Sequence, residues 1–410
     1  MDARRAGRHY APMTLSRRAL LASSAAIFVS AAGCATARVP TLHITPDGTG
    51  DGASWETPTN LEAIEDFSVE PGGEILIAAD RGEYALTDAI EISQGGRNRK
   101  PIRIRGVNSA TGEPMPAMIR GVRGEEETDV FRLLRGANHL TFSHFEFHAI
   151  GNGCFRVGAP ISNITIEDCT ADDIYRFLEN TESGDETAAS LSTFAVRRCS
   201  ATRVQRGFAR IRYGSRDGLF EDCRAVGVSN EGGDIPVGCA LDDRAQNITY
   251  RRCIMENFQQ LNAGDYWNGD GFSDEGDNRN IRYESCEARG STDGGFDCKS
   301  NGVVLENCVA EDNKRNFRLW GDTATLTNCT SRTPNFRGAA VEIASPCHIW
   351  IGGDNAQIQL SDVTIEGDPE TPILVVDSDG VRVQVSGAHP PEDANWDPGD
   401  DAEIVFAPQQ

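Results

Sequence analysis

The sequence predicts an all-β fold, a single-stranded right-handed parallel β-helix (a solenoid) with an N-terminal cap. The first observation is a short phrase of alternating apolar and polar residues that recurs seven times and always ends in Cys. The second is a set of short segments centred on Phe, which lie between these phrases. Alternation with a period of two is typical of strands, and a repeat of about 20 to 50 residues is typical of solenoids. Parallel crossovers are right-handed in nearly all known cases, which predicts the hand.

The repeated phrases predict one strand of each coil. Ile164–Cys169 and Leu219–Cys223 are typical copies. The terminal Cys residues stand at positions 169, 199, 223, 253, 286, 308 and 329. Cys behaves as a small buried hydrophobe, so we expect these side chains to stack along one interior wall. No C-x-x-C pair occurs, which argues against a metal site, whereas disulfides between stacked coils stay open.

The segments centred on Phe predict a second strand in each coil. They are Gly207–Ile211, Gly271–Glu275, Gly295–Lys299 and Asn316–Trp320. We expect Phe208, Phe272, Phe296 and Phe317 to share one register and to stack inside the solenoid, because side chains in a strand alternate between its two faces.

Residues 1–37 have the layout of an export signal of the twin-arginine type. A basic start that includes Arg17 and Arg18 precedes an apolar run over residues 19–32, which is too short to span a bilayer. The signal can end in either of two ways: by cleavage after Ala37, or at a lipoprotein box with a lipid anchor at Cys34. We therefore expect an exported protein with no membrane span, located in the periplasm, anchored at the outer membrane or secreted.

The remaining residues, 38–410, form one predicted β-helix domain. The N-terminal cap covers about residues 38–110, the coils about 110–367, and a closing segment 368–410. A β-helix of this length can stand alone, so we expect a monomer.

The charge of the chain excludes two classes of partner. The 410 residues contain 39 Lys and Arg against 62 Asp and Glu, a net charge of −23. A general nucleic-acid binder needs a basic field to neutralise phosphates, so we expect no nucleic-acid partner. An anionic membrane surface is excluded for the same reason.

Aspartates cluster on two consecutive predicted coils. Aligning Phe272 with Phe296 brings Asp270, Asp293 and Asp297 to one side, on rungs about 4.8 Å apart. Carboxylates this close repel one another unless a cation lies among them, and several hard oxygen ligands favour Ca²⁺. The alternative is that these Asp-Gly pairs only form turns.

A cation follows on the next predicted coil. Arg318 follows Phe317 as Asp297 follows Phe296, so both side chains point outward on neighbouring rungs. Lys299 has the same outward parity as Asp297. A plain surface ion pair is the alternative to a functional site.

Three phrases on these coils carry a family resemblance. Asn268–Ser273 (NGDGFS), Ser291–Asp297 (STDGGFD) and Asn316–Gly321 (NFRLWG) resemble the active-site rungs of family 9 polysaccharide lyases, which are pectate-lyase-like β-helices. The resemblance is close over about residues 265–321 and loose over the rest of the coils.

The resemblance implies a role for each matching position. Asp270, Asp293 and Asp297 would bind calcium, and Arg318 takes the position of the Lys that abstracts the proton. Gly294 stands where the family has a second Asp, so one ligand is missing unless Asp274 or Glu275 compensates. Lys299 is the alternative base.

A cluster of arginines points to an acidic polysaccharide as the substrate. Arg206, Arg210 and Arg212 lie on adjoining coils, and Arg suits bidentate contacts with carboxylate or sulfate. Candidate stacking platforms for the sugar rings are Tyr266, Trp267 and Trp320. The alternatives are surface ion pairs for the arginines and ordinary packing for the aromatic residues.

The sequence predicts a lyase that cleaves an acidic, uronic-acid-containing polysaccharide by β-elimination. A β-helix glycoside hydrolase is an alternative and would use two of the carboxylates of Asp242, Asp243, Asp274 and Asp297. A uronate epimerase shares the first chemical step, and a non-catalytic carbohydrate-binding surface protein would need the groove without a base. The identity of the polymer, and internal or terminal cleavage, stay open.

Overall fold

The computed structural model describes residues 39–124, 128–184, 186–231, 234–261, 264–338, 345–399 and 402–407. One compact unit comprises Arg38–Gln410. The predicted export signal, with Cys34 and Ala37, lies outside the described residues and stays a prediction. No helix in the described part of the chain is long and apolar enough to cross a bilayer.

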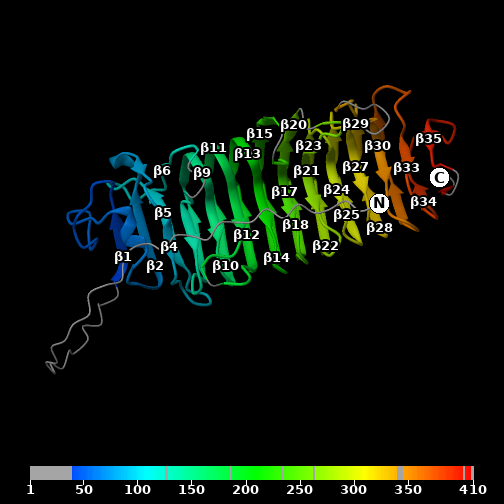
Figure 1. Cartoon of the computed structure of the whole chain (residues 1–410). Helices are drawn as coiled ribbons and strands as arrows, with labels where there is room; N and C mark the ends of the chain where they lie inside the picture. The colour runs from blue at the N-terminus through cyan, green and yellow to red at the C-terminus, as the bar shows by residue number, and fades with distance from the viewer. Residues whose placement is uncertain are drawn as a thin grey trace, which may run out of the picture. The chain divides into compact units, whose positions relative to one another are not determined.

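The unit is built from parallel strands that stack along one axis (Figure 1). The first sheet has 14 strands in sequence order, all paired in parallel. They are β1 (Val39–Ile44), β2 (Val69–Ala78), β5 (Ile102–Val107), β8 (Leu140–Ser143), β10 (Ile161–Glu167), β12 (Leu191–Arg197), β14 (Arg216–Glu221), β18 (Gln246–Arg251), β22 (Arg279–Glu284), β25 (Val303–Glu306), β28 (Thr323–Thr327), β31 (Gln357–Ser361), β34 (Arg382–Ser386) and β36 (Glu403–Phe406).

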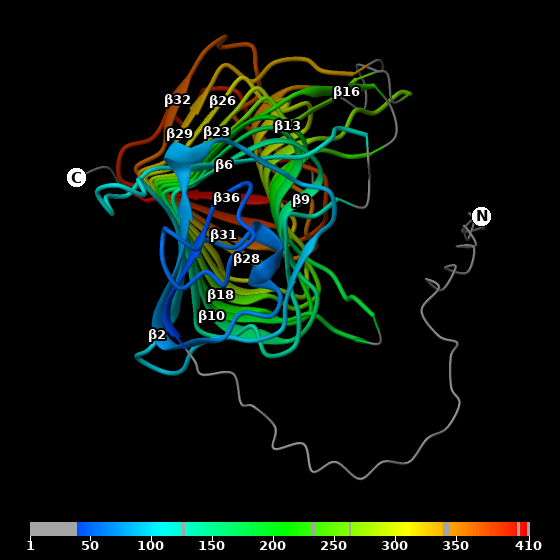
Figure 2. The ribbon, with the colours of Figure 1, turned by 90° about the vertical axis from the view of Figure 1, so that its left-hand side faces the viewer.

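Two further parallel sheets complete each coil (Figure 2), and they share the long bent strands β9 (Phe145–Val157), β11 (Thr170–Asn180) and β13 (Ser200–Ile211). The second sheet also contains β3 (Tyr84–Ala85), β6 (Ala117–Arg120), β15 (Arg224–Gly227), β19 (Ile254–Glu256), β23 (Glu287–Arg289), β26 (Val309–Glu311), β29 (Thr330–Arg332) and β32 (Thr364–Glu366). The third also contains β4 (Ile90–Ile92), β7 (Phe131–Leu133), β17 (Val237–Leu241), β21 (Asp270–Asp274), β24 (Gly294–Cys298), β27 (Arg315–Leu319), β30 (Cys347–Ile351), β33 (Leu374–Val376) and β35 (Trp396–Asp397).

The predicted fold class is confirmed, since the described residues form an all-β fold of parallel sheets stacked as in a parallel β-helix. The helical turns among them are the 3-10 turns η1 (Leu61–Ile64) and η2 (Ala79–Arg81). A small parallel pair lies outside the three sheets and consists of β16 (Ser229–Glu231) and β20 (Gln259–Leu261). The coils extend into both flanking segments, because β1, β2 and β5 precede residue 110 and β33 to β36 follow residue 367.

A residue in the left-handed backbone conformation forms the corner between the first and second sheets. The residue before the Cys has a positive φ in each phrase, for example 54° at Asp168, 56° at Asp222 and 57° at Asn307. Asp and Asn tolerate this conformation better than most residues, because their short polar side chains bond locally. The corner turns the following Cys side chain into the core.

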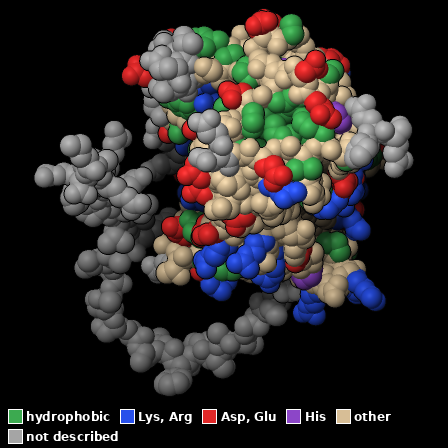
Figure 3. All heavy atoms as spheres, turned by 90° about the vertical axis from the view of Figure 1, so that its right-hand side faces the viewer, with side chains coloured by type: hydrophobic (Ala, Val, Ile, Leu, Met, Phe, Trp, Pro, Cys, Tyr) green, Lys and Arg blue, Asp and Glu red, His purple; other side chains and the backbone are tan. Residues whose placement is uncertain are grey.

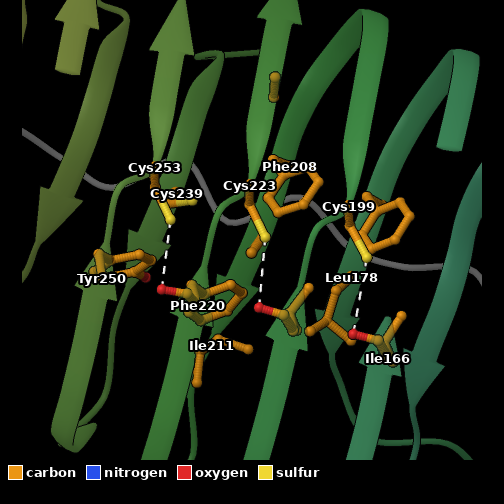
Figure 4. Close-up of a cluster of buried hydrophobic side chains, with 14 of the residues drawn as sticks. Ile166, Leu178, Cys199, Phe208, Ile211, Phe220, Cys223, Cys239, Tyr250 and Cys253 are labelled. Carbon is orange, nitrogen blue, oxygen red and sulfur yellow. Dashed lines mark hydrogen bonds between the residues drawn. The ribbon is translucent and has the colours of Figure 1, made fainter. Parts of the chain in front are cut away.

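The predicted Cys stack is confirmed (Figure 4). All seven side chains are buried, and each of Cys199, Cys223 and Cys253 donates its Sγ–H to a carbonyl of the preceding coil at 3.4–3.8 Å. All 11 cysteines among the described residues are free thiols. Those thiols are therefore packing groups and form no disulfide.

The predicted Phe stack is confirmed for three residues and wrong for the fourth. Phe272, Phe296 and Phe317 pair in register, with ring centroids 5.0 and 5.4 Å apart. Ala209 occupies that register on β13, and Phe208 stacks instead on Phe177 at 4.8 Å. The strand bends as it passes from the second sheet to the third, and both Phe208 and Ala209 are buried there.

The face that carries the last strands shows apolar side chains ringed by acidic ones (Figure 3). Trp396, Ile404 and Phe406 are only partly buried and pack against the end of the core.

Candidate active site

One ladder of side chains runs along the outer face of the third sheet. Its register joins Arg132, Arg156, Glu179, Arg210, Ala240, Ser273, Asp297, Arg318 and Trp350. Most members are long and charged, but Ala240 and Ser273 are small. A central hollow of about 340 Å³ lies over these two residues, between Arg210 and Asp297.

Arg318 bridges two aspartates at one end of the central hollow. Its Nη1 lies 2.7 Å from Asp293 Oδ2 and 3.3 Å from Asp297 Oδ1. Trp320 Nε1 donates to the same Asp297 oxygen at 2.8 Å. Asp297 and Arg318 are register partners on β24 and β27, as their equal distance from Phe predicts.

Two lysines complete the charge balance of this end. Lys299 Nζ lies 3.1 Å from Asp297 Oδ2 and 2.7 Å from Glu275 Oε1. Asp293 Oδ1 accepts a hydrogen bond from Tyr266 Oη at 2.6 Å and lies 3.5 Å from Nζ of the fully buried Lys314. The cations Arg318, Lys299 and Lys314 therefore already neutralise both aspartates.

Asp270 differs from the other carboxyls around the hollow. Among the described residues that line the hollow, four carboxylates each pair with a cation, namely Asp242, Glu275, Asp293 and Asp297. Among these described residues, Asp270 pairs with none. The one hydrogen bond that Asp270 accepts comes from Gly294 N–H at 2.7 Å. Burial, followed by the nearby Asp297 and Asp293 carboxylates, raises the pKa of Asp270 well above its usual range.

The two cations predicted to act as the base both hold their protons. Burial alone would lower the pKa of Arg318, but Asp297 and Asp293 outweigh it and raise that pKa further. Burial alone would likewise lower the pKa of Lys299, but Asp297 and Glu275 outweigh it and raise the pKa of the ammonium. A base must be unprotonated to accept a proton, so neither group suits that role in this arrangement.

The donor set does not fit a calcium ion. Arg318 lies between Asp293 and Asp297, where a metal would have to bridge. A Cβ at Gly294 would lie 3.0 Å from Asp270 Oδ1, 3.1 Å from Asp297 Cβ and 3.3 Å from Arg318 Cδ, so side chains already crowd the position of the missing fourth Asp. Across the described residues, no group of three or more His, Cys, Asp or Glu side chains is arranged to hold a metal. The calcium site therefore stays a prediction from the sequence, and the arrangement of the described side chains does not support it.

Asp274 lies away from the hollow, contrary to its predicted place beside the other aspartates. Its carboxylate is fully buried and accepts hydrogen bonds from Tyr283 Oη at 3.0 Å and from Ser300 N–H at 2.7 Å. Residue parity explains this, because Asp274 has the inward parity of Phe272 on β21.

The predicted substrate-binding residues divide into two groups. Arg206, Arg210 and Tyr266 line the central hollow. The other three lie outside the lining: Arg212 donates to the carbonyl of Asn180 at 3.0 Å, Trp267 Nε1 donates to Gly264 O at 3.2 Å, and Trp320 Nε1 donates to Asp297.

Two residues of the site were missed by sequence reasoning. Lys314 lies one coil beyond Asp293 in the same register, and its Nζ also donates to Trp267 O at 2.9 Å. Arg176 lines the opposite end of the hollow. The signal that could have found both residues in the sequence is their position within a coil. For Arg176 the bend of β11 and β13 obscures that position.

Comparisons with known proteins bear on the fold. No protein-family model and no curated protein matches the sequence. Among solved structures, pectate lyase Pel9A has a TM-score of 0.58 at 18% identity, covering 73% of this chain and 77% of that chain. The A-module of the Azotobacter vinelandii mannuronan C-5 epimerase AlgE4 has a TM-score of 0.51 at 10% identity, covering 82% of this chain and 88% of that one. At such identities the likeness shows a shared β-helix fold.

Proposed function

We propose that this protein is an enzyme that cleaves an acidic polysaccharide by β-elimination in the central hollow. The observation that carries the proposal is the unpaired Asp270 carboxyl beside Arg318, a guanidinium fixed by two aspartates. The first group is suited to move a proton and the second to meet a carboxylate. The pectate lyase fold supports the same class of reaction.

In this proposal Arg318, Lys299 and Asp270 have roles that differ from those predicted from the sequence. Arg318 and Lys299 neutralise the carboxylate of a uronic acid, which makes the neighbouring C-5 proton more acidic. Asp270 accepts that proton, because a carboxylate whose pKa is raised is a stronger base than an ordinary one. The C–H electrons form the C-4=C-5 double bond, the C-4–O bond breaks, and the departing oxygen takes a proton from solvent.

A hydrolase is the second candidate, and the contrast between two carboxyls favours it. The raised pKa of Asp270 beside the lowered pKa of Asp297 resembles the paired acid and base of glycosidases. An epimerase would share the abstraction of the C-5 proton and then return a proton to the opposite face.

The test is to incubate the protein with a panel of uronic-acid polysaccharides and to follow ultraviolet absorbance from unsaturated uronate ends. We expect absorbance on at least one polymer, no loss of rate with a chelator, and loss of turnover in Asp270→Asn. Asp277→Asn, at an exposed aspartate just beyond β21, is the matched control and should keep the rate.

The other outcomes separate the candidates. New reducing ends without absorbance would replace the lyase by the hydrolase. Solvent deuterium at C-5 without cleavage would indicate the epimerase. Loss of all turnover in the chelator would restore the calcium prediction and overturn the neutralising role of Arg318.

A further inference from the structure

Three arginines line the end of the central hollow opposite Arg318. Arg176 comes from β11, and Arg206 and Arg210 come from β13. We call these three residues the arginine end. The proposed elimination makes no use of them.

Arg176 is buried and lies against a glycine. Its side chain is 5% exposed, and its register partner on β13 is Gly207. A Cβ at Gly207 would lie 3.3 Å from Arg176 Nη1 and 2.3 Å from the carbonyl oxygen of Val237. The guanidinium therefore lies across a bare stretch of β13 and against the hollow.

The arginine end has donors without partners. Arg176 Nε lies 3.3 Å from Glu179 Oε2, but it is buried and makes no hydrogen bond, and the same holds for Arg206 Nη1, 3.4 Å from Asp234 Oδ1. Arg210 Nε does donate to Asp242, at 2.8 Å. Burial, with Arg210 and Arg206 as like-charged neighbours, lowers the pKa of Arg176 to about 10. A buried donor left without an acceptor costs free energy, which an incoming oxyanion would recover.

We infer that Arg176, Arg206 and Arg210 form a binding site for a second oxyanion, a carboxylate or sulfate carried by the same sugar chain that reacts at Arg318. This inference rests on the proposed function and narrows its substrate to a chain with anionic groups at both ends of the hollow. A polymer charged only at the cleaved sugar would bring no oxyanion to the arginine end.

The register sets the distance between the two anion positions. From Arg210 to Arg318 the ladder passes Ala240, Ser273 and Asp297, which makes four rungs, or about 19 Å. The second oxyanion therefore belongs to a different sugar from the reacting one. A substrate too short to span the hollow gains nothing from the arginine end.

The test measures binding in the Asp270→Asn protein, so that no ligand is consumed. Calorimetry gives the dissociation constant of an oligouronate long enough to span the hollow, its carboxyl-reduced neutral form, a sulfated neutral oligosaccharide and inorganic sulfate. We expect Arg206→Gln and Arg210→Gln each to weaken binding of the oligouronate about tenfold or more and to leave the neutral form unchanged. Arg224→Gln, at an exposed arginine of the adjoining β15 that pairs with Glu256, is the matched control.

Each arm of the test decides one point. Equal effects of Arg206→Gln and Arg224→Gln on the oligouronate would overturn the site. Binding of inorganic sulfate as tight as that of the oligouronate would overturn its assignment to a sugar chain, and preference for the sulfated ligand would name sulfate as the oxyanion. Because these are binding constants, charge-selective binding together with no turnover by the unsubstituted protein would support the site while rejecting the lyase.

Discussion

At the scale of the residue, Lys314 shows how this site manages charge. Its side chain is fully buried, with Nζ 3.4 Å from the centre of the Tyr266 ring and 3.5 Å from Asp293 Oδ1. Burial lowers the pKa of Lys314 to about 8, against the opposing effect of Asp293. Lys314, the cation near Asp293, therefore loses its proton and its charge at mildly alkaline pH.

This shift predicts a dependence of stability on pH. Between pH 8 and the model-compound value of 10.5, unfolded Lys314 binds a proton that the folded form lacks, so the free energy of unfolding rises with pH. Relative to Lys314→Met, we expect the free energy of unfolding to gain up to about 1.4 kcal/mol per pH unit in this window. Denaturant unfolding at a series of pH values measures it, with Lys100→Met at an exposed lysine as the control. A difference that stays flat from pH 8 to 10.5 would contradict the shift.

Individual residues also mark how far the site could be predicted. Counting from Phe placed Asp297 beside Arg318, because register is fixed along a strand with a period of two. The placement of Asp274 as a substitute for the ligand missing at Gly294 is wrong, because counting from Phe272 gives it inward parity, in agreement with its burial. The same counting would have found Lys314, which precedes Phe317 by three residues as Asp293 precedes Phe296.

At the scale of the element, the strands of the third sheet owe their position to an interior aromatic stack. Phe272 and Phe296 lie parallel at 5.0 Å, and Tyr283 meets both rings edge-on at 5.4 and 5.5 Å. The sequence predicted these strands because each repeats one short apolar pattern. It failed at Phe208, where β13 bends and two successive residues face the core.

We expect Phe296→Ala to lower the free energy of unfolding by about 3–5 kcal/mol, because it opens a cavity in the middle of the stack. Phe336→Ala is the matched control, since that ring is 41% exposed and lies outside the stack. Denaturant unfolding followed by circular dichroism measures both. Equal, small effects of the two substitutions would show that the stack contributes little. Loss of turnover in Phe296→Ala is expected as well, since Asp297 is its direct neighbour.

At the scale of the whole molecule, the central hollow is richer in cations than the rest of the chain. The chain carries a net charge of −23, yet the central hollow has Arg318 and Lys299 at one end and the arginine end at the other. An acidic surface keeps an anionic polymer from binding elsewhere, whereas the hollow offers guanidinium groups that suit carboxylate or sulfate. Selectivity for one groove therefore follows from the distribution of charge along the coils.

The solenoid also predicts how the protein responds to reductant. The described cysteines are all free and buried, and several donate their thiol hydrogens to carbonyls of the preceding coil. Cohesion between coils thus comes from parallel hydrogen bonding and core packing, and neither depends on redox conditions.

We expect the midpoint of thermal unfolding to be the same with and without a thiol reductant. Loss of a stabilising disulfide would instead cost about 2–5 kcal/mol and lower the midpoint by several degrees. A midpoint that falls in reductant would show that coils are cross-linked, and thiol titration of the unfolded chain would then count the missing thiols.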